Sequence, residues 1–252
     1  MSIEGKVAMV TGSSGALGRM HSLSLAKVGC NIAVTGHSHL EKAEAVCEEV
    51  RALGRKAVAV KMDVANIEEV QEGVKKVEKE VGPIDILVNN AAFGIVRAVT
   101  IAQMDHKDWD RDLGVNLTGA FNTIKCCMPG MIERGWGRII NISSIAGTRG
   151  GMGQCSYAAT KAGLIGLTKT AALEGARNGV TCNAIVLGVF DGGSFYEVAE
   201  PFRERIIKRL ALRRAGDPQE LSNVVVFLAS EESSYLTGEA IEVSGGASLF
   251  TF

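Results

Sequence analysis

Seven short runs rich in valine, isoleucine and alanine alternate with longer segments of helical spacing, and this alternation constrains the fold more than any other feature of the sequence. Runs of this kind, bounded by Gly, Asn or Asp, are typical of strands buried on both faces of a parallel sheet. They are Val7–Val10, Ile32–Val34, Ala57–Val60, Ile84–Val88, Ile139–Ile142, Val180–Val186 and Ala240–Val243. The order predicts an α/β fold with a doubly wound, seven-stranded parallel sheet and helices on both faces.

Two segments between the runs carry clear helical patterns. Residues 40–53 are charged and amphipathic, and residues 67–81 repeat apolar side chains at helical spacing. One long irregular stretch, 188–215, has two adjacent glycines near its start and a charged, helix-like segment after them. Because α/β folds often hold about 250 residues in one domain, we expect a single domain over 1–252 with a substrate-binding lid at 188–215.

Glycine is over-represented, at 30 of 252 residues against about 7 % in an average protein. Three of these glycines join the first run to the first helix-like stretch. Glycine there lets the backbone turn sharply beside a pyrophosphate, and the helix N-terminus then offers N–H groups to the anion. We therefore expect a Rossmann dinucleotide site that uses Gly12, Ser14, Gly15, Leu17 and Gly18. A glycine-rich turn without a ligand is the alternative.

The end of the second run decides which dinucleotide binds, because an acidic residue there favours NAD and a cationic one favours NADP. The chain has Gly36-His37-Ser38-His39 and no carboxylate at this point. Glycine leaves room for a 2′-phosphate. His37, Ser38 and His39 could donate hydrogen bonds to it with help from Arg19, and His37 is the contact that we expect. The sequence thus favours NADP over NAD as the cofactor. The alternative is that both histidines are solvated loop residues.

Tyr157 and Lys161 stand four residues apart in a segment of small and apolar side chains. Positions i and i+4 share one face of a helix, so both side chains can point into one cleft. A phenol with a pKa of about 10 is a poor base at neutral pH, and a nearby ammonium group lowers that pKa. The pair therefore predicts a tyrosine general acid/base assisted by a lysine.

With these motifs in order, the chain resembles the short-chain dehydrogenase/reductase family from Lys6 to about Gly246. Within that family it is most similar to bacterial 3-oxoacyl-[acyl-carrier-protein] reductases and related secondary-alcohol dehydrogenases. The resemblance implies an NAD(P)-dependent oxidoreductase that interconverts a secondary alcohol and a ketone by hydride transfer. It includes the glycine turn, Asp63-Val64, Asn89-Asn90-Ala91-Ala92, Asn116, Ser144, the Tyr157/Lys161 pair, Asn183 and the segments 227–230 and 236–238.

The resemblance implies four catalytic residues. Tyr157 would exchange the proton of the substrate oxygen, and Lys161 would lower the pKa of Tyr157 and hold the nicotinamide ribose. Ser144 would hydrogen-bond the substrate oxygen. Ser143 is the alternative to Ser144, but the spacing of thirteen residues to Tyr157 favours Ser144. Asn116 would anchor a water chain that connects Lys161 to solvent, or it would simply cap a helix kink.

The resemblance also implies cofactor contacts beyond the glycine turn. Asp63 would accept a hydrogen bond from adenine, although it can also be only a turn residue. Asn89 would brace the fourth strand, and Ala91 would pass beneath the adenosine ribose. The contacts expected in this part of the site are Asp63, Val64, Asn89, Ala91, Tyr157, Lys161, Gly188 and Val189.

The chain departs from the family pattern in three segments. Ala16 stands where glycine is usual, and Ala92 stands where the fourth-strand motif ends in glycine. The Pro-Gly after the sixth strand is Leu187-Gly188 here, and the threonine expected to contact the nicotinamide carboxamide falls on Gly192. Ser194 is the candidate replacement for that threonine.

The residues expected on the substrate side are mostly apolar, which suits a small-molecule ketone or alcohol on a hydrophobic carbon skeleton. Phe93, Gln154 and Phe190 are the predicted contacts in addition to Ser144 and Tyr157, and Gln154 offers one polar group. The wider wall is expected to include Ile95, Val96, Ala146, Thr148, Phe195 and Tyr196.

Two enzyme functions are open at this point: an alcohol dehydrogenase or carbonyl reductase, which we favour, and a 3-oxoacyl-[acyl-carrier-protein] reductase of fatty-acid synthesis. The second docks an acidic carrier protein, yet Leu173 and Glu174 stand where basic residues are usual. Arg134, Arg138 and Arg149 are the candidate docking residues. A non-catalytic dinucleotide-sensing protein is a third reading, although such a protein would be expected to lose the four catalytic residues that this chain keeps.

Charge and spacing exclude other classes. The formal net charge is −1, without the basic excess of a nucleic-acid-binding protein. We see no window of about 18 apolar residues, no secretory signal and no patterned cysteines. We therefore expect a cytoplasmic protein with no membrane segment and no metal site. The family resemblance and the apolar tail Leu249–Phe252 predict a homotetramer.

Overall fold

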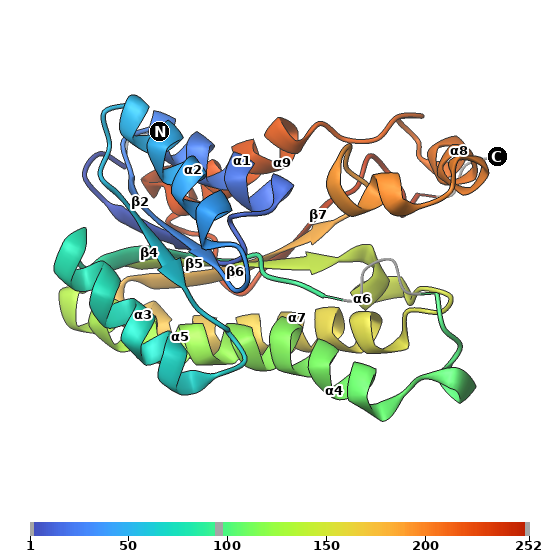
Figure 1. Ribbon diagram of the computed structural model, residues 1–252, viewed down its shortest axis with the longest axis horizontal. Helices are drawn as coiled ribbons and strands as arrows, with labels where there is room; N and C mark the ends of the chain where they lie inside the picture. Colours follow the sequence, from blue (N-terminus) through green and yellow to red (C-terminus); the bar gives the residue numbers. More distant parts are fainter. Residues whose placement is uncertain (1–2, 94–97, 250–252) are drawn as a thin grey trace.

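The computed structural model describes residues 3–93 and 98–249, without the side chain of Ser194. Its centre is a seven-stranded sheet in the order β3-β2-β1-β4-β5-β6-β7, with every pair of neighbours parallel (Figure 1). All seven predicted runs are strands, and the predicted α/β fold is confirmed. The strands are β1 Val7–Val10, β2 Asn31–Gly36, β3 Ala57–Lys61, β4 Ile84–Asn89, β5 Gly137–Ser144, β6 Val180–Leu187 and β7 Ala240–Val243.

Helices cover both faces of the sheet, as the alternation predicted (Figure 1). Helices α1, α2 and α9 bury Leu25, Val46 and Leu221 against one face, and α3, α5 and α7 bury Val70 and Met131 with their neighbours against the other. The helices are α1 Ala16–Lys27, α2 Leu40–Ala52, α3 Ile67–Glu80, α4 His106–Leu113, α5 Gly119–Arg134, α6 Ile145–Arg149, α7 Cys155–Gly175, α8 Glu200–Arg209 and α9 Pro218–Ala229.

The two helices predicted at 40–53 and 67–81 are α2 and α3. Helix α3 begins after Asn66, whose side-chain oxygen accepts from the backbone N–H groups of Glu68 and Glu69 and so satisfies two donors of the first turn. Within the described residues, no helix is both long and apolar enough to span a bilayer. Nor does this part of the chain bring together three His, Cys, Asp or Glu side chains that could hold a metal ion.

The stretch predicted as an irregular lid, 188–215, is partly helical. Phe190 pairs with Gly216 in an isolated parallel bridge. A 3-10 turn, η4 (Gly193–Glu197), then leads into α8. No residue of α8 is buried, so few apolar contacts hold this helix to the rest of the fold. Segments with so little buried surface belong to the less stable parts of a native structure.

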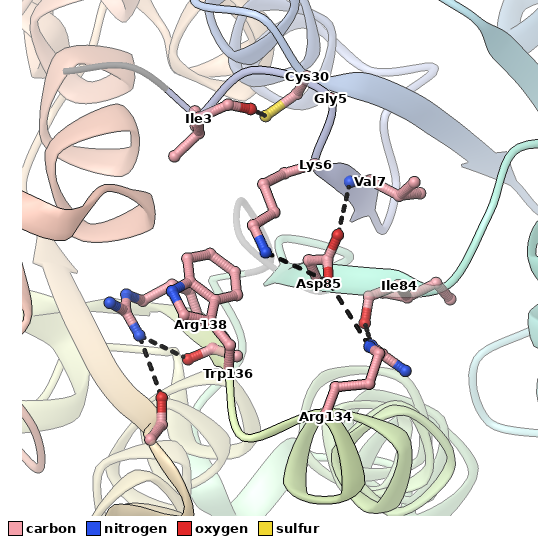
Figure 2. A network of polar contacts seen from close by, with 12 residues as sticks. Ile3, Gly5, Lys6, Val7, Cys30, Ile84, Asp85, Arg134, Trp136 and Arg138 are labelled. Atoms are coloured by element: carbon pink, nitrogen blue, oxygen red, sulfur yellow. Dashed lines mark hydrogen bonds and ion pairs between the residues drawn. The ribbon is translucent and has the colours of Figure 1, made fainter.

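A polar network lies at the amino ends of the strands (Figure 2). The buried carboxylate of Asp85, on β4, accepts from the backbone N–H of Val7 at 3.1 Å. The same carboxylate lies 3.8 Å from the Lys6 ammonium and 3.7 Å from the Arg134 guanidinium. Arg134 also donates to the carbonyl oxygen of Ile84 at 2.6 Å. One carboxylate thus ties β1, β4 and the end of α5 together.

Trp136 belongs to the same network and lies within reach of two cations (Figure 2). The Lys6 ammonium is 4.0 Å from its ring centroid and the Arg138 guanidinium 4.5 Å. Arg138 is 2 % exposed and donates to the carbonyl oxygens of Ser230 and Gly179. This burial excludes Arg138 as a docking residue for a carrier protein, which corrects the expectation from sequence.

His21 lies in the packing between α1 and α9. Its Nδ1 is 2.8 Å from the Ser222 hydroxyl oxygen, and its Nε2 has no hydrogen-bond partner in the described part of the chain. Burial lowers the pKa of His21 from 6.5 to about 4. Between these pH values the unfolded chain binds a proton that the native protein does not, so the free energy of unfolding falls as the pH falls.

We expect His21→Asn to remove this pH dependence, because asparagine can keep a contact with Ser222 and does not titrate. Between pH 6.5 and 4, the wild type should lose about 3 kcal/mol more unfolding free energy than the variant, since one pKa unit is worth about 1.4 kcal/mol. Urea unfolding at several pH values measures the difference. Parallel losses in the two proteins would contradict the assignment to His21.

Candidate active site

A cavity of about 970 Å³ opens along the carboxyl ends of β1 to β6. This edge includes the place where β1 lies between β2 and β4, so successive crossovers leave in opposite directions. Open parallel sheets bind ligands at such a point, and the volume is that of a ligand or cofactor site. The cavity is lined by all the predicted cofactor contacts except Asn89 and by all the predicted catalytic residues except Asn116. The five principal substrate contacts also line it, namely Phe93, Ser144, Gln154, Tyr157 and Phe190.

Two glycines of the turn are packed too tightly to accept side chains. A Cβ at Gly18 would lie 2.6 Å from the Gly12 carbonyl oxygen, and one at Gly12 would lie 3.0 Å from Ala91 Cα. Gly15 precedes α1, whose N-terminus has no side-chain cap and no acidic residue in its first turn. Because Leu17 of that turn lines the cavity, the positive end of the α1 dipole faces the cavity. This arrangement fits the pyrophosphate of a dinucleotide.

Asn90, which sequence reasoning did not select as a site residue, holds this turn against β4. Its side-chain amide donates to the carbonyl oxygen of Thr11 at 2.9 Å, and its backbone N–H donates to the Thr11 hydroxyl at 2.9 Å. Asn89 is buried instead: it donates to the Asn141 side-chain oxygen and accepts from the Thr123 hydroxyl. Side chains alternate along a strand, and this alternation is the signal that could have separated the two asparagines.

The loop after β2 carries the residues expected to distinguish NADP from NAD. His37 Nδ1 is 3.0 Å from the Ser38 hydroxyl, and its Nε2 is 3.8 Å from the Asp63 carboxylate. His39 Nδ1 is 3.1 Å from the Glu41 carboxylate. Each histidine therefore faces a carboxylate at the rim of the cavity. The lining residues of this loop are Gly36, His37, Ser38 and His39.

Arg19 and Asp63 lie next to this loop, and both were expected to contact the cofactor. Arg19 is turned away: its Nε donates to Glu49 Oε1 at 2.8 Å and its Nη2 pairs with the other oxygen. Because Glu49 of α2 already satisfies the guanidinium, the expected help of Arg19 with a 2′-phosphate is not supported. Asp63 lines the cavity, where its hydrogen bond from adenine stays a prediction. It also accepts from the Ala65 backbone N–H at 2.9 Å, as a turn residue does.

Ser144, Tyr157 and Lys161 meet in the cavity wall. Tyr157 and Lys161 lie one turn apart on α7 and are 5 % and 2 % exposed. The Lys161 ammonium lies 5.5 Å from the Tyr157 ring centroid and donates to the Ile142 carbonyl oxygen at 2.7 Å. Ser144 is hydrogen-bonded to Tyr157, whereas the Ser143 hydroxyl donates to the Lys161 carbonyl oxygen at 2.7 Å. Ser144 therefore faces the site, and Ser143 braces α7.

Burial dominates the proton affinities of this pair. It raises the pKa of Tyr157 to about 12, against a smaller lowering by the hydrogen bond with Ser144. It lowers the pKa of Lys161 to about 8. We expected Lys161 to lower the pKa of Tyr157, but in the protein alone the desolvation of a phenolate outweighs that effect. At neutral pH Tyr157 is therefore a phenol that can give up a proton.

Asn116 lies in a π-helical turn, η2 (Gly114–Thr118), which joins α4 to α5. Its side chain exchanges two hydrogen bonds with the backbone of Phe93, at 2.7 and 3.0 Å, and donates to the Thr160 hydroxyl at 3.2 Å. Such turns occur frequently at functional sites. Asn116 thus occupies an irregular turn within a helix, and from there it connects the loop after β4 to the helix turn before Lys161.

The substrate side of the cavity is largely apolar. Two residues expected there do not line it: Thr148 donates to the Ile145 carbonyl oxygen, and the exposed Tyr196 donates to Asp191 at 2.6 Å. Ile95 and Val96 lie outside the described residues. Arg111, Val198 and Ile206 also line the cavity, and no local sequence signal marked them. The expected residues that do line it are Phe93, Ala146, Gln154, Phe190 and Phe195.

Gly192, at the position expected to hold threonine, lines the cavity with φ +94°. Side-chain-bearing residues rarely adopt this backbone conformation, so a threonine would strain the segment. The backbone path therefore accounts for the departure from the family pattern. The side chain of Ser194, the candidate replacement, lies outside the described structure.

Comparison with known proteins finds relatives along the whole chain. A family model described as enoyl-(acyl carrier protein) reductase matches residues 12–248. The 3-oxoacyl-[acyl-carrier-protein] reductase FabG of Staphylococcus epidermidis is 41 % identical over 241 residues, 96 % of this chain and 98 % of the relative.

Two solved structures are similar over nearly the full length. The 3-oxoacyl-[acyl-carrier protein] reductase of Brucella melitensis has a TM-score of 0.92 and 31 % identity, covering 97 % of this chain and 92 % of the other. A protein with the provisional name gluconate dehydrogenase, from Agrobacterium tumefaciens, has a TM-score of 0.94 and 32 % identity, covering 99 % and 98 %. The structures therefore share one architecture across relatives named for different substrates.

The lowered pKa of Lys161 predicts a rise in stability with pH. Above pH 8 the native protein releases a proton that the unfolded chain keeps until about pH 10.5. Relative to Lys161→Met, the unfolding free energy of the wild type should therefore rise by about 2–3 kcal/mol between pH 7.5 and 10. Titration of Tyr157 affects both proteins and cancels in the difference.

Urea unfolding at half-unit pH steps measures this difference. Lys208→Met is the control, because Lys208 is exposed and its removal should leave the pH dependence of stability unchanged. A constant difference between wild type and Lys161→Met over this range would show that the Lys161 ammonium is not destabilised by burial.

Proposed function

The chain belongs to the short-chain dehydrogenase/reductase family, and we propose that within this family it is a 3-oxoacyl-[acyl-carrier-protein] reductase that uses NADPH. Membership makes the protein an NAD(P)-dependent oxidoreductase. The proposed reaction reduces the ketone of a 3-oxoacyl thioester to a secondary alcohol. From sequence alone we ranked this function below a general alcohol dehydrogenase or carbonyl reductase, and the names of the relatives support the reversed order.

One observation carries the proposal: the cluster of Ser144, Tyr157 and Lys161 lines the same cavity as the uncapped N-terminus of α1. Gly12, Gly15 and the first turn of α1 would hold the pyrophosphate of the dinucleotide. When bound, the nicotinamide would supply the hydride that the ketone carbon accepts. The protein then has to orient the ketone and supply a proton to its oxygen.

Tyr157 is the proposed proton donor. Because burial raises its pKa to about 12, the hydroxyl keeps its proton at neutral pH and can transfer it to the oxygen as negative charge develops there. The resulting phenolate lies beside the Lys161 ammonium, which favours the charged form. The protonation state of the protein alone thus suits reduction better than oxidation.

Ser144 is the proposed anchor for the ketone oxygen. Its hydroxyl oxygen accepts from the Ala146 backbone N–H at 3.2 Å and caps α6, which holds the side chain in one orientation. A donor held in advance at the place where negative charge develops stabilises that charge without reorganisation. Asn116 remains the proposed link between Lys161 and solvent.

The apolar part of the cavity supports an acyl substrate. Phe190 and Ala146 are buried, and Phe195, Val198 and Ile206 of the lid segment also line the space. An acyl chain would be buried there by the hydrophobic effect. Gln154 supplies a polar group that suits the carbonyl or amide groups of a thioester carrier.

The docking surface for an acidic carrier is proposed on α8. The end of α7 offers Leu173, which is 82 % exposed. Helix α8 carries Arg203, Arg205 and Lys208, while its Ile206 lines the cavity. The absence of basic residues at the end of α7 is the observation that favours the second candidate function, a dehydrogenase of another hydrophobic secondary alcohol.

NADPH is the proposed cofactor because the loop after β2 contains donors and no carboxylate of its own. Gly36 leaves space beside the Ser14 side chain, and His37 and Ser38 are exposed donors at the cavity rim. His37, whose Nε2 lies 3.8 Å from the Asp63 carboxylate, is the proposed donor to the 2′-phosphate. NAD remains the alternative that the binding experiment below distinguishes.

Assembly and location remain proposals. We propose a homotetramer in the cytoplasm that acts on small-molecule or carrier-bound ketones and binds neither nucleic acid nor membranes. The support is the family resemblance and the near-neutral charge. Of the apolar tail, Leu249 is 65 % exposed and Phe250–Phe252 lie outside the described residues. Light scattering after gel filtration measures the oligomeric state.

We expect the purified protein to reduce acetoacetyl-coenzyme A with NADPH, and Tyr157→Phe to lower kcat by about 10³-fold while NADPH still binds. Phenylalanine keeps the packing of the ring and removes the proton donor. Tyr235→Phe is the matched control, because Tyr235 is fully exposed. An undiminished kcat in Tyr157→Phe would refute the mechanism, and faster turnover of simple secondary alcohols than of the thioester would favour the second candidate.

The cofactor proposal predicts a preference for a 2′-phosphate that depends on His37. His37→Ala removes the proposed donor, so the affinity ratio of 2′,5′-ADP over 5′-AMP should fall about fivefold, the effect of about 1 kcal/mol. His37→Arg supplies a cation that suits a phosphate and should keep or raise the ratio.

Titration calorimetry measures both ligands without turnover. The charged groups that face the loop, namely Asp63, Glu41 and the neighbouring Lys42, are the same in all three proteins and cancel in the comparison. Equal affinity of wild type for the two ligands would sink the NADPH proposal.

A further inference from the structure

A buried carboxylate lies beside the catalytic helix and takes no part in the proton transfer proposed above. Asp112, near the end of α4, is 0 % exposed and is the one buried residue of that helix. Burial of an ionised carboxylate is strongly unfavourable unless hydrogen bonds or opposite charges compensate it. The side chains around Asp112 should therefore include groups that compensate its charge.

The first of these groups is Ser156. Its hydroxyl donates to Asp112 Oδ2 at 2.6 Å, a length typical of a charge-assisted O–H···O⁻ bond. Ser156 immediately precedes Tyr157 in the first turn of α7. The carbonyl oxygen of Tyr157 in turn accepts from the Thr160 hydroxyl at 2.8 Å. One bond from α4 thus holds the turn that carries the proposed proton donor.

Helix α7 starts without a cap of its own. Gln154, at the N-cap position, makes no capping hydrogen bond through its side chain, and the first turn contains no acidic residue. A negative charge near a helix N-terminus is stabilising because it opposes the positive end of the dipole. Asp112 supplies that charge from a neighbouring helix, through its contact with Ser156.

Arg111 connects Asp112 to the cavity. The guanidinium lies 3.5 Å from Asp112 Oδ1 and 2.7 Å from the Asp108 carboxylate. It also lines the cavity and lies 4.4 Å from the ring centroid of Phe93. The charge of Asp112 is therefore balanced by a cation in the wall of the substrate cavity.

We propose that Asp112 is a positioning residue: through Ser156 it orients the first turn of α7 so that the Tyr157 hydroxyl points at the substrate oxygen, with Arg111 as counter-ion. This inference rests on the proposed function, because it presupposes that Tyr157 donates the proton. Asp112 does not line the cavity, and its proposed effect on Tyr157 passes through Ser156. A misplacement of a reacting group by about 1 Å can lower a rate about 100-fold.

Asp112→Val and Ser156→Ala are expected to lower kcat for NADPH-dependent reduction of acetoacetyl-coenzyme A about tenfold or more. The Kd of NADPH, measured by fluorescence, should stay within about twofold. Asp112→Asn should return kcat to within about threefold of wild type, because the amide oxygen still accepts from Ser156. The Tm of Asp112→Val is also expected to fall, because valine leaves the buried Ser156 hydroxyl without its acceptor.

Asp108→Asn is the matched control. It removes the other carboxylate beside Arg111, on the same helix, without touching Ser156, and it should keep the wild-type kcat. A kcat within about twofold of wild type in both Asp112→Val and Ser156→Ala would overturn the inference. A lowered Tm with an unchanged kcat per folded molecule would also overturn it, because that is the signature of a structural role alone.

Two further measurements keep the test decisive. If Asp112→Val does not fold, the kcat values of Ser156→Ala and Asp112→Asn test the proposal. Ser156→Ala keeps the Asp112 carboxylate, and Asp112→Asn puts an amide in its place, so both retain a polar side chain at position 112. Tyr157→Phe, measured in parallel, separates the two levels of the argument. An active Tyr157→Phe enzyme overturns the proposed function, whereas an inactive one beside a fully active Ser156→Ala enzyme overturns only the role of Asp112.

Discussion

Every strand of the sheet is parallel, so all seven carboxyl ends meet at one edge, and the rest of the structure depends on this constraint. The glycine turn follows β1, the histidine loop follows β2 and Ser144 ends β5, yet all three line one cavity. No single loop contains the site. At the opposite edge, Asp85 and Trp136 contact the side chains of Lys6, Arg134 and Arg138, and these contacts link neighbouring strands. The candidate site and the stabilising polar network thus lie at opposite ends of the strands. The carboxyl edge can therefore carry the uncapped N-terminus of α1 and the glycine turn.

The features predicted correctly from sequence are those set by local rules. Runs of valine and isoleucine between Gly, Asn and Asp identified the strands because a strand buried on both faces tolerates little else. Tyr157 and Lys161 were placed together because a helix has a fixed period. The failures are side-chain partnerships over long sequence separations. Arg19 bonds Glu49, thirty residues away, and this contact depends on how α1 and α2 pack, which no local pattern encodes.

The electrostatics of the site show the same limit. From sequence, a lysine one turn from a tyrosine implies a lowered tyrosine pKa. In the structure both groups are almost fully buried, and desolvation moves the pKa values of Tyr157 and Lys161 toward the neutral forms of both groups. Burial depends on α6, α7 and β5 packing around the pair, so its effect is invisible in a short motif. Asp112 gives a second example. An acidic residue is usually exposed, but Asp112 is wholly buried.

The π-helical turn at Gly114–Thr118 makes α4, η2 and α5 one uninterrupted helical rod from His106 to Arg134. A rod of this kind carries a phase, because each residue advances the side-chain direction by about 100°. The π turn contains one extra residue. This residue shifts the direction of the Asp112 side chain around the rod axis relative to those of Asn122 and Met131, which lie beyond the turn. Loss of one residue there would leave every strand intact and turn one half of the rod against the other. The part of the rod that holds the proposed positioning residue Asp112 and the part that packs into the core can therefore be oriented independently of each other.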